Sequence, residues 1–256
     1  MRWRFLDSGA LEGAEQMAID AGLMDRARRT GEAVLRVYAW HRATLSFGRH
    51  ESAKGRFSPA VLEAAGVSVV RRPTGGRVLL HDHEVTYSVT APANEGEPLR
   101  ASYRNINGML LDALLRLGVV ATEATHGGAL RPARATLLAC FAAPSAGELV
   151  VGNRKLVASA QVRERGALLQ HGSILVEDDQ PRITSLASGG LTAAMPAATL
   201  RTCLGRAPAY AEVRDALRLA LVAAVPRVTA LDPAESSAYA HPLRARFANA
   251  EWTWRR

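Results

Sequence analysis

The clearest structural pattern in the chain is the alternation of polar and apolar residues over 84–90. Apolar side chains fall at every second position from Val85 to Val89, which is typical of a strand with one buried face. The stretch just before it reads "RRPTGGRVLLHDH" and includes the adjacent glycines Gly75 and Gly76. Neighbouring glycines either turn the chain sharply or leave room for another group to approach the backbone. The sequence therefore predicts a strand that follows a tight turn or a narrow slot.

A helical spacing of apolar residues predicts helices in three further places. In the first, Met17 and Met24 belong to one apolar face, and Gly31 follows as a stop. Ser102 is the predicted N-cap of the second helix, which Gly118 ends. The predicted helices cover residues 12–30, 102–117 and about 211–225, and Pro226 stops the last one.

Short apolar runs between turn residues predict the remaining strands. Gly166 lies in the turn of a predicted hairpin, whereas residues 121–147 lack any clear periodicity and form a long segment of the kind that often carries function. Strands and helices do not alternate regularly, so the sequence favours an α+β fold over a doubly wound sheet. The predicted strands cover 34–40, 43–48, 66–72, 154–162 and 167–176.

The composition adds a positive charge to this picture. The chain has 32 Lys and Arg against 24 Asp and Glu, a formal net charge of +8. Such an excess of positive charge either attracts acidic partners or reflects only the surface arginines of an Arg-rich chain, without a binding role. Aromatic residues make up 5% of the sequence, and no signature of nucleic-acid binding is present, so nucleic acid is not an expected partner.

The same survey bears on the membrane and on the cellular compartment. No apolar run reaches the roughly 18 residues of a membrane span, so no membrane partner is expected. The N-terminus lacks the apolar core of a secretory signal. With only Cys140 and Cys203, no disulfide framework is expected, and we expect a cytoplasmic protein.

Two residues of reactive type lie in or near the irregular segment. Cys140 falls inside it, where a thiol can meet a substrate, although a single cysteine is more often a buried apolar residue. Cys203 lies on a predicted helix and is expected to fill the core. Lys155 begins a strand, and its ammonium group either extends to solvent or points into a cleft, where it would stabilise a thiolate or a carbonyl oxygen. These residue types suggest acyl transfer.

Three histidines are candidate acids or bases because they titrate near neutral pH. They are His81, His83 and His171, and their spacing matches no metal-binding pattern, so no metal is expected. His171 is expected to be structural, and the role of His81 stays open. The pair Gly75 and Gly76 is followed by neither the lysine of a P-loop nor the helix of a dinucleotide fingerprint, which excludes both.

Several blocks of the sequence resemble the biotin/lipoate ligase and octanoyltransferase superfamily. They are "MAIDAGL" at 17–23, "LRVYAW" at 35–40, "VRRPTGGRVLLHDHEVTYSV" at 70–89 and "GNRKLVASAQVRERGALLQHGSIL" at 152–175. Together with "ACFAAPSAGELVVGNRK", they look most like the cysteine-dependent octanoyltransferases of the LipM type. The resemblance implies one catalytic domain over 1–256, with a mixed, largely antiparallel sheet flanked by helices. Its motif-bearing core would span roughly 31–205, followed by a C-terminal helical extension.

The resemblance also implies a reaction and a set of site residues. An octanoyl group would move from octanoyl-acyl carrier protein to a lysine of a lipoyl domain or of glycine cleavage H protein, without ATP, a metal or another cofactor. Cys140 would form the thioester, and Lys155 would lower its pKa or polarise the thioester carbonyl. Ala158 stands where the family commonly has glycine. The implied substrate-binding residues are Arg72, Gly75, Gly76, His81, Ser159 and His171.

Three alternatives remain open. An ATP-dependent lipoate-protein ligase shares the lysine and glycine motifs but needs no cysteine at position 140 and usually carries an accessory C-terminal domain. An octanoyl amidotransferase, acting between two lipoyl-bearing proteins, uses a cysteine on the same scaffold. In a non-catalytic acyl-protein binding module, Cys140 would be dispensable. The sequence ranks the transferase first.

Overall fold

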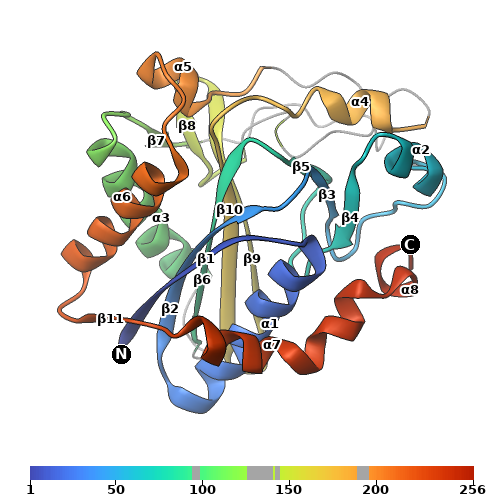
Figure 1. The fold of residues 1–256 in the computed structure, drawn as a ribbon. Coiled ribbons are helices and arrows are strands. Elements are labelled where there is room, and N and C mark those ends of the chain that lie inside the picture. Colours follow the sequence, from blue (N-terminus) through green and yellow to red (C-terminus); the bar gives the residue numbers. More distant parts are fainter. Residues whose placement is uncertain (94–98, 126–140, 142–144, 189–195) are drawn as a thin grey trace.

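The computed structural model describes residues 1–93, 99–125, 141, 145–188 and 196–256 (Figure 1). The strands are β1 (Trp3–Leu11), β2 (Ala33–Trp40), β3 (Thr44–Phe47), β4 (Ser68–Arg71), β5 (Leu79–His81), β6 (Glu84–Pro92), β7 (Thr122–Glu123), β8 (Leu149–Val151), β9 (Arg154–Glu164), β10 (Ala167–Leu175) and β11 (Val228–Ala230). The helices are α1 (Gly13–Thr30), α2 (Pro59–Ala64), α3 (Leu99–Arg116), α4 (Arg182–Leu186), α5 (Leu200–Leu204), α6 (Tyr210–Ala224), α7 (Pro233–Ala248) and α8 (Ala250–Thr253).

Two sheets organise these elements. The large sheet has the strand order β11-β1-β2-β6-β10-β9-β8-β7. Strands β11, β1 and β2 are parallel, and every pair from β2 to β7 is antiparallel. The small sheet has the order β4-β3-β5, with β3 parallel to β4 and antiparallel to β5. The predicted mixed, largely antiparallel sheet flanked by helices is therefore confirmed.

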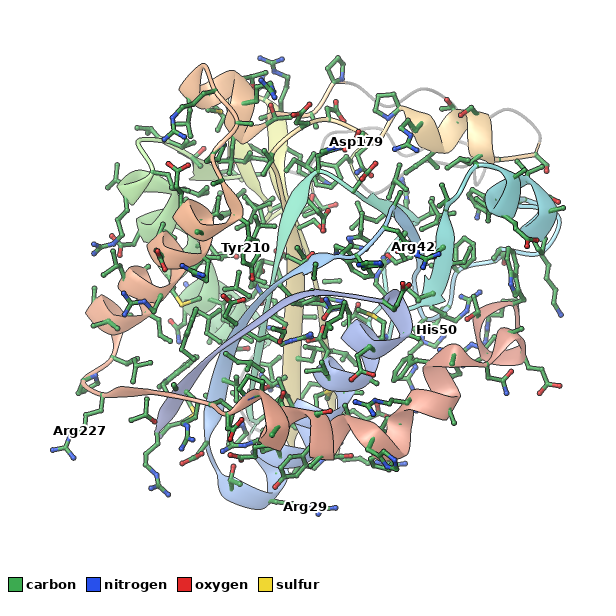
Figure 2. The ribbon with its side chains drawn as sticks, viewed as in Figure 1. Arg29, Arg42, His50, Asp179, Tyr210 and Arg227 are labelled. Atoms are coloured by element: carbon green, nitrogen blue, oxygen red, sulfur yellow. The ribbon has the colours of Figure 1, made fainter. Side chains whose placement is uncertain are left out.

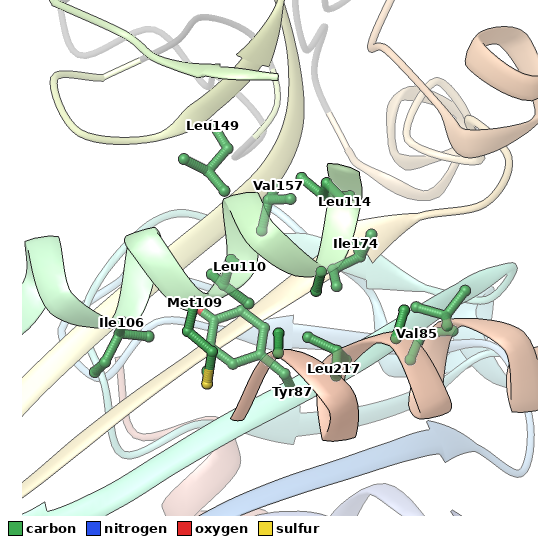
Figure 3. Packing of buried hydrophobic residues seen from close by; sticks show 14 of the residues in the cluster. Val85, Tyr87, Ile106, Met109, Leu110, Leu114, Leu149, Val157, Ile174 and Leu217 are labelled. Carbon is green, nitrogen blue, oxygen red and sulfur yellow. The ribbon is translucent and has the colours of Figure 1, made fainter. Parts of the chain in front are cut away.

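Helices cover both faces of the large sheet because its strands are apolar on both sides. Leu35 and Val37 of β2 pack in the cluster that α3 and α6 cover, whereas Val34 and Tyr38 face α1 and α7. Figure 1 shows the two helix pairs on opposite sides of the sheet. Figure 3 shows the α3 side, where Leu110 and other apolar side chains of α3 and α6 lie against the strands. None of the described helices has the length and apolar character needed to cross a membrane.

Helix α1 begins and ends close to the predicted positions. Gly31 adopts a left-handed conformation, with φ at 68°, and its N–H donates to Ala27 O at 3.0 Å, which is the usual way for a glycine to end a helix. Inside the helix, a Cβ atom on Gly22 would lie 2.6 Å from Tyr239 O of α7. A glycine here allows α1 and α7 to approach closely.

Some boundaries differ from the prediction. Ser102 is not an N-cap, because α3 already begins at Leu99 and contains it. Its hydroxyl instead accepts a hydrogen bond from Arg163 on β9 at 3.2 Å, so a residue typical of helix starts serves here as a tertiary contact. The strand expected at 66–72 is shorter, and β1 was not predicted, since its "WRFLDSGAL" sequence has no regular alternation.

A fully buried ion pair joins α1 to the large sheet. Arg36 Nη1 of β2 lies 2.7 Å from Asp20 Oδ1 of α1, and both side chains have no exposed surface. Asp20 also accepts hydrogen bonds from Tyr38 at 3.0 Å and from Ser88 at 2.7 Å. Burial by itself raises the pKa of Asp20, but Arg36 and the other donors outweigh it and hold the pKa below its usual value. The carboxylate is therefore ionised and well satisfied.

Removal of this carboxylate is expected to be costly, because it leaves the Arg36 charge buried without its counter-charge. Asp20→Asn should lower the free energy of unfolding by about 3–5 kcal/mol, measured by urea denaturation. Asp112→Asn, which breaks an exposed pair with Arg116, is the matched control and should change it by less than about 1 kcal/mol. Equal, small decreases in the free energy of unfolding in both variants would show that the buried pair contributes no more to stability than the exposed one.

Candidate active site

A pocket lies between the large and small sheets, and four of the predicted substrate-binding residues line it. Arg72, His81, Ser159 and His171 all contribute to its wall. The space between atoms at the pocket is about 380 Å³ and includes open solvent, so it is not the volume of a closed cavity. Its other lining residues are Met17, Tyr38, Trp40, Ser46, Leu79, Thr86, Ala158, Ala160, Gly172 and Ser173.

This pocket runs across the strands of the large sheet. Ala158 on β9 is paired with Ser173 on β10, which is paired on its other side with Thr86 of β6. Thr86 is paired in turn with Tyr38 of β2, and all four residues line the pocket. Because neighbouring strands are about 4.8 Å apart, the distance from β9 to β2 is about 14 Å. An extended ligand can therefore lie perpendicular to the strands.

A stacked aromatic pair forms part of the wall near β2. The rings of Trp40 and His81 have centroids 4.0 Å apart and an interplanar angle of 20°. Glu84 holds both rings, since its Oε1 atom lies 3.2 Å from Trp40 Nε1 and 2.8 Å from His81 Nδ1. Thr86 accepts from Trp40 Nε1 at 2.8 Å, and Ser46 Oγ lies 2.8 Å from His81 Nε2. A buried carboxylate thus fixes this wall.

Arg72 organises the two-glycine turn. Its Nε donates to Gly75 O at 3.1 Å, and its Nη2 donates to Arg77 O at 2.7 Å. On the other side, a Cβ atom added to Gly48 would lie only 1.9 Å from Gly76 O. Gly75 and Gly76 are not among the described residues that line the pocket. Their predicted place beside the acyl chain stays a prediction, and what the structure shows is a tightly packed turn.

His171 connects this turn to helix α1. Its Nδ1 lies 3.1 Å from Asp20 Oδ2, and its Nε2 lies 2.6 Å from Thr74 Oγ1. Burial lowers the pKa of His171, so the ring is neutral near pH 7. Because the ionised Asp20 can only accept, Nδ1 carries the proton, and Nε2 accepts from the Thr74 hydroxyl. Thr74 directly precedes the two glycines, so the network of Asp20 extends to the edge of the pocket.

A β-bulge sets the direction of Lys155. Leu149 is paired with Val157 but Val150 is paired with Lys155, so β9 contains one extra residue, Leu156. As a result, Leu156 and Val157 both pack in the cluster below α3 and α6. Beyond the bulge, the side chains again alternate between the two faces of the strand, so Lys155 points to the face opposite Leu156 and Val157. Bulges often redirect a side chain in this way next to active sites.

Lys155 lies beside the pocket without lining it. Its Nζ is 2.6 Å from Glu148 Oε2 and 5.6 Å from the ring centre of Phe141. Phe141 packs with Leu79 and Ala158, which do line the pocket. The ammonium group is therefore placed at the β9 end of the pocket, behind one aromatic side chain.

Ser159 is held by the phenol of Tyr87, with the two oxygen atoms 2.7 Å apart. Gln170 Nε2 donates to the same phenol at 2.9 Å, and burial raises the pKa of Tyr87 to about 12. A Cβ atom on the neighbouring Gly172 would lie 2.5 Å from Ala158 O and 2.7 Å from Ser159 Oγ. The close packing of β9 against β10 at this point therefore requires glycine.

The two cysteines stand differently. Cys140 lies outside the described residues. Cys203 lies on α5, half-buried, and packs against the core cluster of α3 and α6, as predicted.

His83 is exposed and lies 2.9 Å from Asp179, whose hydrogen bond raises the pKa of the histidine. Asp82, His83 and Asp179 could reach a common ion in the described part of the chain, but Asp82 also pairs with Arg182.

Several residues that build the site were not predicted from the sequence. Asp20, Trp40, Glu84 and Glu148 were not singled out. A signal was present for Asp20, which stands between apolar residues in "MAIDAGL", and for its partner Arg36 in "VLRVYAW". A charged residue inside an apolar run must find a partner when it is buried.

The chain belongs to the lipoyl protein ligase A/B catalytic domain family, which matches residues 12–222. Octanoyltransferase LipM of Symbiobacterium thermophilum is 41% identical over 230 residues, covering 84% of this chain and 83% of the relative. For octanoyltransferase LipM of Kyrpidia tusciae the identity is 44% over 69% of this chain and 67% of the relative. For that of Bacillus subtilis it is 38% over 72% and 69%. These relatives confirm the predicted family and the predicted class of acyltransferase.

Solved structures show the same fold. A lipoate-protein ligase A bound with ATP matches with a TM-score of 0.79 at 18% identity, covering 99% of each chain. A bipartite lipoate protein ligase from Thermoplasma acidophilum matches with a TM-score of 0.76 at 18% identity, covering 99% of this chain and 96% of the other. At such identities the likeness concerns the fold alone, and it agrees with the α+β prediction.

The packing of the two-glycine turn can be tested at Gly48. In Gly48→Ala, the new methyl group would collide with Gly76 O, so the turn must move and the free energy of unfolding should fall by about 1–3 kcal/mol. Gly108→Ala on α3 is the control, since nothing lies within 4 Å of its added Cβ, and it should be neutral or stabilising by up to about 1 kcal/mol. Urea denaturation measures both. A Gly48→Ala variant as stable as the wild type would contradict the close approach.

Proposed function

We propose that this protein transfers an octanoyl group from octanoyl-acyl carrier protein to a lysine of a lipoyl domain or glycine cleavage H protein. The observation that carries the proposal is the position of Lys155 beside the pocket, on its β9 side and next to Phe141. Phe141 is joined by a peptide bond to Cys140, the proposed nucleophile. The relatives named octanoyltransferase LipM support the same reaction.

The proposed reaction has two half-reactions and requires neither ATP nor a metal. In the first, the Cys140 sulfur bonds to the octanoyl carbonyl carbon, the bond to the pantetheine sulfur breaks, and the proton of the Cys140 thiol ends on the released thiol. In the second, the acceptor lysine nitrogen bonds to the carbonyl carbon, the bond from this carbon to the Cys140 sulfur breaks, and a proton from the amine ends on that sulfur. Both steps exchange one acyl bond for another, which is nucleophilic catalysis through a covalent intermediate.

The separation of the outermost strands that line the pocket supports an eight-carbon substrate. With carbon–carbon bonds of about 1.5 Å in a zigzag, an extended octanoyl chain is about 9 Å long. The span of about 14 Å from β9 to β2 accommodates this chain together with the thioester at the Lys155 end. Arg72, His81, Ser159 and His171 would then line the acyl chain. The stacked Trp40 and His81 would limit its length near β2.

The proposed partners are proteins, and charge supports their approach. The chain carries a formal net charge of +8, which would attract acidic partners and speed their encounter. Figure 2 shows Arg29 and Arg227 extending from separate parts of the surface. The bipartite ligase from Thermoplasma acidophilum was studied with its E2 lipoyl domain, which supports a lipoyl domain as the acceptor here.

Intact-protein mass spectrometry tests the proposal directly. After mixing with octanoyl-acyl carrier protein, without ATP, the wild type should gain one octanoyl group that hydroxylamine removes, because a thioester is labile to this nucleophile. Cys140→Ser should gain none. Cys203→Ser, which alters the other cysteine, is the matched control and should be acylated like the wild type. Modification of a lipoyl domain only with free octanoic acid and ATP would favour the ligase instead.

The orientation of the acyl chain gives a second prediction. Trp40→Leu removes the large ring near β2, so the variant should accept longer chains. The ratio of kcat/KM for dodecanoyl over octanoyl donors should rise by about 10-fold or more, which corresponds to about 1.4 kcal/mol. Trp252→Leu is the control, because Trp252 packs between Arg246 and Arg255 and not in the pocket. A ratio that changes equally in both variants would place the chain elsewhere.

A further inference from the structure

Glu148 forms a buried ion pair with Lys155 that the proposed reaction does not yet use. The side chains of Lys155 and Glu148 are 2% and 8% exposed, and Nζ lies 2.6 Å from Oε2. The same Oε2 atom accepts the backbone N–H of Ser145 at 2.6 Å. Two donors thus converge on one carboxylate oxygen beside the pocket.

The segment around Glu148 is firmly held. Glu148 N donates to Ser145 O at 3.0 Å, and Ala124 N donates to Glu148 O at 2.8 Å. Asn107 of α3 donates to Gly147 O at 2.6 Å and to Glu123 Oε1 of β7 at 2.9 Å. The carboxylate therefore comes from a backbone that is fixed on both sides, and it can fix the ammonium group in turn.

A buried ion pair adds little net stability compared with apolar residues of the same volume in its place. Two buried charges lose most of the energy of their attraction to desolvation, so apolar residues would serve a core equally well. Burial raises the pKa of Glu148, while Lys155 and the Ser145 N–H lower it, with a net rise. A pair that is costly to bury, redirected by a β-bulge towards the pocket, is the kind of arrangement found where a charged group has a chemical task.

Resting on the proposed function, we propose that Glu148 is a positioning residue that holds the Lys155 ammonium group in place, so that Lys155 acts as a cation and hydrogen-bond donor. An ammonium group has three N–H donors, and Glu148 takes one of them. In each half-reaction, negative charge develops on the thioester carbonyl oxygen and on the departing sulfur. A fixed ammonium group stabilises that charge without removing a proton from the nucleophile. Either role that the resemblance implies for Lys155, lowering the pKa of Cys140 or polarising the thioester carbonyl, needs a fixed cation of this kind.

The test uses Glu148→Gln and Glu148→Asp in the full chain, with octanoyl-pantetheine as a small donor. The rate of Cys140 acylation is followed by mass spectrometry between pH 6 and 10. Glu148→Gln should be slower by roughly 10- to 100-fold, the range seen when a group that orients a primary ligand is removed. The alkaline limb of its rate–pH profile should also move to lower pH, because a buried ammonium group without its counter-charge releases its proton more readily. Glu148→Asp keeps the charge and should restore most of the rate and the position of the limb.

Two other charged residues of the described chain lie near the pair. Arg154 precedes Lys155 but is exposed, and Glu123 is held by Asn107. Glu177→Gln is the matched control, because Glu177 forms a surface pair with Arg201 at 2.7 Å, with side chains 39% and 53% exposed. It should leave both the rate and the profile unchanged.

Two results would overturn the inference while leaving the proposed function intact. One is a Glu148→Gln variant with the rate and the alkaline limb of the wild type. The other is an acid limb that moves to lower pH with a higher rate near neutrality, which would show that Lys155 acts as a base. If Glu148→Gln does not fold, a Glu148→Asp variant with a wild-type profile supports the role of the charge, and one that loses the alkaline activity despite its carboxylate contradicts it. Absence of acylation in the wild type would instead refute the proposed function.

Discussion

The buried pair of Arg36 and Asp20 is the interaction on which the pocket depends most. It joins α1 to β2, and through Ser88 and His171 it reaches β6 and β10. From His171 the hydrogen bonds continue to Thr74, at the start of the two-glycine turn. One ionised carboxylate therefore orders the floor and one edge of the pocket together, and a change at Asp20 is expected to affect ligand binding as well as stability.

The opposite end of the pocket is built on a different principle. There a single extra residue in β9 reverses the direction of the Lys155 side chain. The carboxylate of Glu148, which directly precedes β8, forms an ion pair with it. Neither feature requires the pair at Arg36. The two ends are linked by the hydrogen-bonded ladder of β9, β10, β6 and β2, which keeps them at a constant separation.

The sequence predicted the parts of this structure that follow from local patterns. The alternation over 84–90 and the apolar face of 12–30 gave β6 and α1, and Gly31 ended the helix as expected. The resemblance led to Arg72, His81, Ser159 and His171, which the fold brings to one pocket. The bulge at Leu156 and the partner of Lys155 could not be predicted, because both depend on the pairing of strands. In the sequence, Glu148 has the pattern of an ordinary loop residue. Only the pairing of β8 with β9 brings it next to Lys155.

The orientation of the pocket has a consequence for how such a site can change. The pocket runs across the strands and not along one of them. Each further strand that it crosses therefore adds about 4.8 Å, the length of about four methylene groups. A site between helices could be lengthened gradually. Here the backbone of the sheet allows the pocket length to change only by a whole strand spacing, and smaller changes depend on side chains such as Trp40. In the proposed acyl pocket, a shift in preferred chain length by one or two carbons should therefore be traceable to a few large-to-small exchanges on β2, with the backbone unaltered.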